Sequence, residues 1–183
     1  MRPRRTHGGA PRVLRAAVLL LLAGCATAAR GGEAPSPVAL RLEPGRWEAV
    51  TRTEMGGSLL VEFAPRGESA ESWTRLVSVQ TYPDDRVPYP GVRWAAAQCR
   101  ALLMDRCPGA TWATLTDTPD DGMYEWRVAG CPDEPDQHEV GRIFREGSTW
   151  ARVTFTVKGT MDAATRAEWL RRLAEARFAG ARP

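Results

Sequence analysis

Histidine and lysine are nearly missing from this chain, which has two histidines and one lysine among its 183 residues. His7 lies in an N-terminal segment that we expect to be removed, so His138 is the one histidine left to act as a base near neutral pH. The sequence also has no GxSxG nucleophile motif, no phosphate-binding P-loop and no GxGxxG motif. A catalytic triad would have to use His138, and no serine stands out as its nucleophile. These absences argue against the common hydrolase and nucleotide-binding classes.

Long hydrophobic runs are missing as well. The main apolar stretch, residues 16–23, is far shorter than the roughly 20 residues that a helix needs to cross a bilayer. It follows an arginine-rich start and leads into the tetrapeptide Leu-Ala-Gly-Cys at residues 22–25. This pattern predicts a bacterial lipoprotein signal peptide over residues 1–24, with cleavage before Cys25 and lipidation of Cys25.

The predicted signal peptide accounts for the positive charge of the sequence. Of the 25 basic residues, five arginines lie in residues 1–24, which contain none of the 22 acidic residues. The mature chain therefore has 20 basic and 22 acidic residues, a net charge of −2, which argues against phosphate-driven binding to nucleic acid. Acyl chains on Cys25 would attach the protein to a membrane. Because Ala26 is not the aspartate associated with inner-membrane retention, we expect the outer membrane, with the domain facing the periplasm.

The rest of the chain predicts one α+β domain. Residues 25–45 have the composition of a flexible tether, residues 46–178 predict the globular domain, and residues 179–183 form a short tail. Strands dominate and tight turns join several of them, so we expect a mostly antiparallel sheet flanked by two amphipathic helices. The expected strands are 46–53, 58–64, 73–82, 123–130, 138–145 and 150–158, and the expected helices are 93–106 and 163–177, the second capped by Asp162.

A set of short motifs runs through this domain: Leu60-Val61-Glu62-Phe63, Gly67-Glu68, Trp73-Thr74, Cys107-Pro108-Gly109, Tyr124-Glu125-Trp126-Arg127, Cys131-Pro132 and Asp136-Gln137-His138-Glu139. As a set, they resemble an uncharacterised family of proteobacterial envelope proteins over most of residues 58–175. The resemblance implies a location in the cell envelope and carries no activity, substrate or catalytic residue. The order of elements is also similar to that of PsbP-like domains, which implies a sheet flanked by helices.

Three cysteines remain once Cys25 is lipidated, so one of them stays unpaired. Cys107 and Cys131 each end a predicted element just before a proline, and an oxidising periplasm permits disulfides. We predict a Cys107–Cys131 disulfide, with Cys99–Cys131 as the competing pairing. Cys99 would then be a small buried residue on the apolar face of its helix.

The acidic segment around His138 is the best candidate for chemistry. Carboxylates and imidazole suit several divalent metal ions, so Asp136, His138 and Glu139 are candidate metal ligands. Their spacing matches no established metal motif. The alternative is a solvated acidic loop that leads into a strand, with a hydrogen-bonded histidine. No cofactor is predicted.

Seven tryptophans offer a second kind of site, because exposed indoles stack on sugar rings. Trp126 and Trp169 lie on apolar stripes and are expected in the core, whereas the other five are open to either interpretation. The sequence favours a non-catalytic binding or assembly module whose partner is an envelope protein or a cell-wall component. The alternatives are a metal-dependent envelope hydrolase centred on His138 and a glycan or small-ligand binder that uses surface tryptophans.

Overall fold

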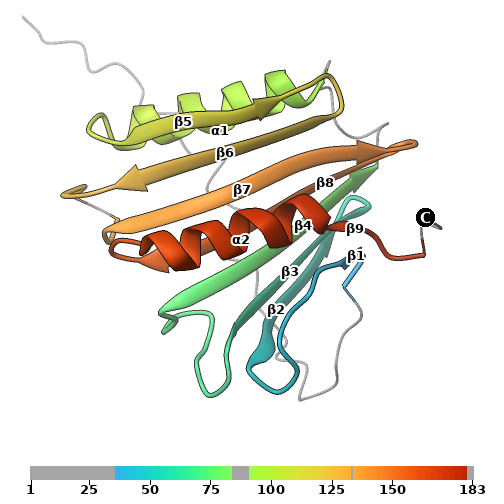
Figure 1. Cartoon of the computed structure of the whole chain (residues 1–183), viewed down its shortest axis with the longest axis horizontal. Coiled ribbons are helices and arrows are strands. Elements are labelled where there is room, and N and C mark those ends of the chain that lie inside the picture. The colour runs from blue at the N-terminus through green and yellow to red at the C-terminus, as the bar shows by residue number, and fades with distance from the viewer. Residues whose placement is uncertain (1–35, 84–90, 133, 181–183) are drawn as a thin grey trace, which may run out of the picture.

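A large antiparallel sheet organises the molecule (Figure 1). The computed structural model describes residues 36–83, 91–132 and 134–180. The strands of the sheet follow the order β2-β3-β4-β8-β7-β6-β5, and every neighbouring pair is antiparallel. With two helices packed on this sheet, the predicted α+β class is confirmed. The elements are β1 Val38–Ala39, β2 Trp47–Met55, β3 Ser58–Pro65, β4 Arg75–Pro83, α1 Val92–Arg106, β5 Thr111–Asp117, β6 Asp121–Val128, β7 Gln137–Glu146, β8 Thr149–Lys158, α2 Ala163–Glu175 and β9 Arg177–Phe178.

Strand β8 lies at the middle of the sheet, and its alternating residues define two faces. Ala151, Val153, Phe155 and Val157 are buried on one face, where they form the main core together with α2. Trp169 of α2 stacks on Phe155 with ring centroids 3.9 Å apart. Burial stabilises the fold by roughly 1.5–3 kcal/mol for each large apolar side chain, so this face carries much of the stability.

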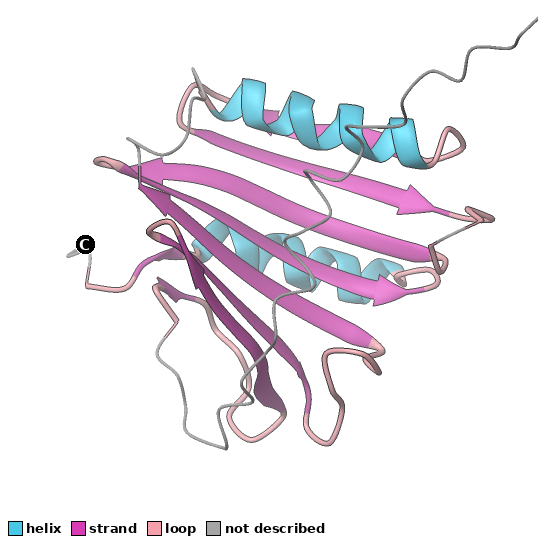
Figure 2. Ribbon diagram, turned by 180° about the vertical axis from the view of Figure 1, so that it is seen from behind, coloured by secondary structure: helices cyan, strands magenta, loops and turns pink. Residues whose placement is uncertain are grey.

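Helix α1 covers part of the opposite face, as Figures 1 and 2 show together. Its buried residues Val92 and Ala95 pack with Tyr124, Ile143 and Trp150 in a second, smaller core. The helix lies on β5, β6 and β7. Most of the same face of β8, β4, β3 and β2 has no helix of the described residues over it (Figure 2).

The folded domain begins before the predicted boundary at residue 46. Strand β1 pairs with β9, and Val38 is only 1% exposed in the main core. Leu40 and Leu42 also pack against that core. The lack of a periodic pattern predicts a tether for this segment. In the structure, its apolar residues pack in the same core as Leu173 and Ala176 at the end of α2.

Polar groups close both ends of α2. Asp162 caps its start, as predicted, by accepting hydrogen bonds from the backbone N–H groups of Ala164 and Thr165. At its other end, Arg142 of β7 donates to the carbonyl oxygens of Leu173 and Ala176 at 2.8 Å. A cation at the carboxyl end of a helix satisfies unpaired carbonyls and complements the helix dipole.

The six predicted strands and both predicted helices are present, with ends that differ by about two residues. Helix α2 ends at Glu175, short of the predicted end at 177, because Ala176 is extended and leads into β9. Strand β5 and the short strands β1 and β9 were not predicted. Over the described residues, no helix has both the length and the apolar character required to cross a bilayer.

Candidate functional site

The three candidate metal ligands do not meet at one place. His138 and Glu139 are consecutive in β7, so their side chains point to opposite faces of the sheet. Asp136 lies before the strand and accepts a hydrogen bond from the backbone N–H of Gly130 at 2.8 Å. In the described part of the chain, no group of three or more histidine, cysteine, aspartate or glutamate side chains is placed to hold a metal ion. The hydrolase alternative is therefore not favoured.

His138 is fully buried and all of its polar atoms have partners. Its Nδ1 accepts a hydrogen bond from the backbone N–H of Met161 at 3.1 Å, so the ring proton sits on Nε2 and is donated to Glu125 at 2.6 Å. Arg127 lies 3.3 Å from the same nitrogen and acts there as a nearby positive charge. Burial lowers the pKa of His138 below its ordinary 6.5, and Arg127 adds to this, although the hydrogen bond to Glu125 opposes it. His138 is a neutral structural residue that ties β7 to the segment before α2.

The partner of His138 is held by a stronger contact. Arg166 of α2 donates to both carboxylate oxygens of Glu125, with the shortest distance 2.6 Å. These hydrogen bonds, together with the one from His138, lower the pKa of Glu125 to about 2, against the raising effect of burial. Glu125 is therefore ionised at neutral pH and fastens α2 to β6.

Glu139 lies in a second polar network on the opposite face. One carboxylate oxygen accepts hydrogen bonds from the Tyr124 hydroxyl at 3.1 Å, the Trp126 indole at 2.9 Å and the Arg152 guanidinium at 3.0 Å. The other accepts from Thr156 at 2.9 Å. Burial raises the pKa of Tyr124 well above 10, so its hydroxyl stays protonated. Tyr124 packs under α1, whereas Arg152 and Trp126 line the part of this face that α1 leaves open and help to form its polar floor.

Above that floor lies a groove of about 950 Å³. All seven strands of the sheet contribute residues to its lining, β5 through Trp112, and α1 forms one wall. Met55 and Leu102, which are 50% and 48% exposed, are two of its lining residues. No pattern in the sequence predicts this groove, because the position of the groove depends on where α1 stops covering the sheet. The alternation of β8, with Arg152 and Thr156 opposite its apolar face, was the available signal of a polar surface.

Most of the tryptophans lie in the core or along the groove, and Trp94 is 37% exposed on α1. Trp150 and Trp169 are buried. Trp73, Trp112 and Trp126 are partly exposed and line the groove. The expected core position of Trp126 is confirmed in part, because its ring packs against the second core but stays partly exposed.

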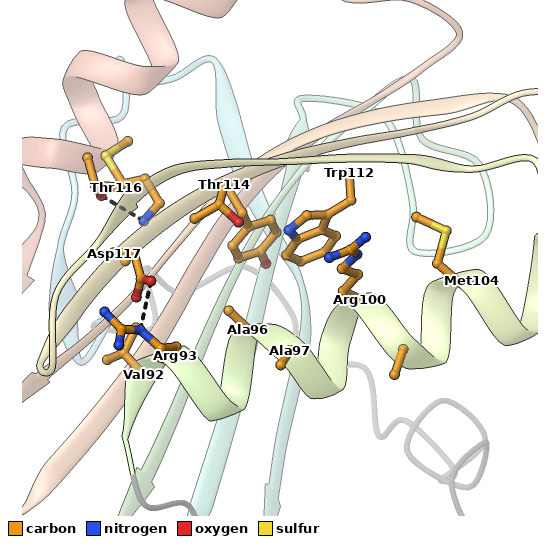
Figure 3. A pocket seen from close by; sticks show the side chains of 14 residues that line it. Val92, Arg93, Ala96, Ala97, Arg100, Met104, Trp112, Thr114, Thr116 and Asp117 are labelled. Carbon is orange, nitrogen blue, oxygen red and sulfur yellow. Dashed lines mark hydrogen bonds and ion pairs between the residues drawn. The ribbon is translucent and has the colours of Figure 1, made fainter.

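A smaller pocket of about 360 Å³ lies between α1 and β5 (Figure 3). Arg93 and Asp117 pair across one end at 2.7 Å, and Trp112 forms the other end beside Arg100. Apart from these groups, small and apolar side chains such as Ala96 line most of it. Trp112 is thus shared between the pocket and the groove.

The cysteines lie at the end of the groove. Cys107 and Cys131 are joined by a disulfide with a Cα–Cα distance of 5.6 Å, which links the end of α1 to the end of β6. Cys99 is a free thiol that packs against the second core, as expected, but is only partly buried and also lines the groove. Cys25, the predicted lipidation site, lies outside the described residues.

Comparison with known proteins shows similarity at the level of the fold. The chain is similar to the solved structure of the Ran-binding protein Mog1p of Saccharomyces cerevisiae, with 10% identity, a TM-score of 0.52, and coverage of 78% of this chain and 90% of that one. A point mutant of protein Mog1 matches over the same shares at 10% identity with a TM-score of 0.49. No protein-family model matches the sequence, and no curated protein is similar to it. The similarity supports the α+β architecture, and the resemblance to an envelope family stays a prediction.

Proposed function

We propose that this chain is a non-catalytic binding module of the bacterial envelope, which holds a protein partner in the groove. The groove is the observation that carries this proposal. It combines a polar floor with partly exposed aromatic rings and with two of the most exposed large apolar side chains, Met55 and Leu102. Surfaces of this kind are typical of protein-binding sites, because the apolar groups gain from burial and the polar groups fix the orientation.

The hydrogen bonds of His138 and Glu139 disfavour catalysis at these two candidate residues. His138 is buried with both ring nitrogens occupied, and Glu139 accepts four hydrogen bonds from its own chain. Neither group is available to move a proton to or from a bound substrate. The fold neighbour Mog1p is described as a Ran-binding protein, which agrees with a binding role for this architecture without identifying a partner for this chain.

Attachment to the membrane is the second part of the proposal. Lipid on Cys25 and a tether after it would keep the domain close to the membrane surface. Tethering raises the effective concentration of the domain around envelope partners and so favours their capture. The location that we propose is the outer membrane, with the domain in the periplasm.

A photo-crosslinking amino acid placed in living cells tests the groove. We would substitute Leu102, which lines the groove, and Gln98, an exposed control residue on the same helix that does not line it. The proposal expects a discrete crosslinked protein from position 102 and none from position 98. Identical products from both positions, or none from position 102, would contradict it.

Cell fractionation of the Cys25→Ser variant tests the anchor. Removal of the acylated thiol should release the processed or unprocessed protein from outer-membrane lipid, whereas the parent chain stays with the membrane fraction. The control is Cys99→Ser, which removes a thiol without touching the signal sequence and should stay membrane-bound. A Cys25→Ser protein that fractionates with the outer membrane as the parent does would refute the anchor.

A further inference from the structure

The charged side chains that line the groove are mostly acidic. Four glutamates and two arginines are among the lining residues, so the surface carries a negative excess. A partner with complementary charge would be cationic. The six residues are Glu54, Glu62, Glu71, Glu134, Arg106 and Arg152.

Both arginines are already neutralised by their own chain. Arg152 pairs with Glu139 at 3.0 Å and also donates to the Tyr124 hydroxyl at 2.7 Å. Arg106 lies 3.6 Å from Glu134 across the end of the groove. Neither guanidinium is therefore left to attract an anionic ligand, which argues against phosphate groups or acidic peptides as the occupant.

Two of the acidic side chains lack such neutralisation. Glu62 is partly buried and accepts a hydrogen bond from the Ser78 hydroxyl at 3.1 Å, and Glu71 accepts from Ser69 at 2.9 Å. Within the described ranges, neither carboxylate forms an ion pair with an arginine or lysine. A carboxylate that is partly desolvated and bonded to neutral hydroxyls gains when a cation approaches.

The tryptophans of the groove suit the same kind of group. Trp73 already has the ammonium of Lys158 over its ring, 4.8 Å from the ring centroid. Trp112 and Trp126 offer two further rings along the lining. An indole face attracts lysine and arginine head groups, and their methylene stems pack well against aromatic carbon.

The distance that the groove spans across the sheet determines how long a bound peptide could be. Its lining extends over all seven strands of the sheet, from β2 to β5, and six spacings of about 4.8 Å amount to about 29 Å. An extended peptide advances about 3.3 Å per residue, so about nine residues would cross this distance.

We infer that the groove holds an extended basic segment of a partner protein, about nine residues long, whose lysine or arginine side chains pair with Glu62 and Glu71. This inference rests on the proposed function, because it specifies the chemistry of the partner in the same groove.

Calorimetric titration of the purified full chain with two peptides tests the inference. One peptide has four Lys-Thr repeats and the other has four Glu-Thr repeats, and both have blocked ends. The basic peptide should bind and the acidic one should not. The Glu62→Gln variant should bind the basic peptide about tenfold more weakly, since a hydrogen bond to a charged group is typically worth enough for that loss. Near-ultraviolet circular dichroism confirms that each variant is folded.

Glu146→Gln is the matched control, because Glu146 is exposed at the turn between β7 and β8 and does not line the groove. It makes the same change in net charge and should leave the affinity unchanged. Equal affinity for the two peptides, equal loss in Glu62→Gln and Glu146→Gln, or no binding of the basic peptide would overturn the inference.

The crosslinking experiment separates this inference from the proposed function. If the Leu102 crosslink persists unchanged in a Glu62→Gln/Glu71→Gln chain, the groove binds a partner through other chemistry, and only the inference fails. If the parent chain gives no crosslink from Leu102, the proposed function fails as well. A crosslinked product with twice the mass of the chain would identify a second copy as the occupant and would also overturn the basic-segment inference.

Discussion

Neutralising Glu125 should weaken the fold and remove a specific part of its dependence on pH. Glu125 is 9% exposed and joins β6 to Arg166 of α2 and to His138 of β7. The substitution Glu125→Gln keeps the size of the side chain but removes the negative charge that these partners share. The loss falls on the contact that fastens α2 over the main core.

The magnitude follows from the lowered pKa of Glu125. Its value falls from 4.5 to about 2 on folding, chiefly because of the hydrogen bonds from Arg166. Each pKa unit corresponds to about 1.4 kcal/mol, so the ionised carboxylate contributes about 3 kcal/mol to the free energy of unfolding. Because the folded value is the lower one, this contribution is complete above pH 4.5 and is lost as the pH falls from 4.5 to about 2.

His138 adds an earlier step with the same sign. Its folded pKa is also lowered, so the unfolded chain takes up a proton first as the pH falls below 6.5, and the folded state loses stability there. Between pH 4.5 and 2 the remaining decline should come mainly from Glu125 and from Glu43, whose pKa is also lowered to about 2, chiefly by the hydrogen bonds from Arg172.

Urea unfolding followed by tryptophan fluorescence, at a series of pH values from 7 to 2.5, measures both effects. We expect Glu125→Gln to be less stable than the parent at pH 7 by about 3 kcal/mol and to lose less of its stability between pH 4.5 and 2.5, where Glu43 still contributes to the decline. The control Glu146→Gln should follow the parent curve. Parallel curves for the parent and Glu125→Gln below pH 4.5 would refute the reasoning.

Two further predictions concern the packing on the groove side of the sheet. A Cβ at Gly141 would lie 2.4 Å from the Tyr124 ring, which Glu139 and Arg152 hold in place by hydrogen bonds. Gly141→Ala should therefore lower the free energy of unfolding by about 1–3 kcal/mol, and an unchanged urea midpoint would contradict this. Cys131→Ser should lower the free energy of unfolding by about 3 kcal/mol, because it removes the disulfide to Cys107, 24 residues away in the sequence. Non-reducing peptide mapping of the parent should find those two cysteines joined and Cys99 free for alkylation, and a peptide joined through Cys99 would disprove the pairing.

Local patterns were sufficient for most of the fold. The apolar alternation of 151–157 in β8 and the cap at Asp162 predicted a strand and a helix start that the structure has. Strand β5 was not predicted, because it lies at the edge of the sheet with most of its residues exposed, and burial imposes no alternation on its sequence. Strands β1 and β9 were not predicted, because a pairing of two residues leaves no periodic pattern in the sequence.

The site was harder to predict because its parts come together only in three dimensions. His138 and Glu139 were grouped with Asp136 since they are adjacent in sequence, yet adjacency within a strand separates side chains to opposite faces. The groove, in contrast, joins α1 to strands that lie before and after it in the sequence, and Glu62 and Trp126 gave no local sign of meeting there. Its position depends on how much of the sheet α1 covers, which no single segment encodes.

Crosslinking from both rims of the groove tests the central claim most directly. Met55 on β2 and Leu102 on α1 both line the groove, whereas Gln98 does not. The photo-reactive residue is placed at each of these positions in turn in living cells. If the partner lies in the groove, positions 55 and 102 capture the same protein and position 98 does not. Different proteins from the two rims, or the same product from all three positions, would contradict binding in the groove.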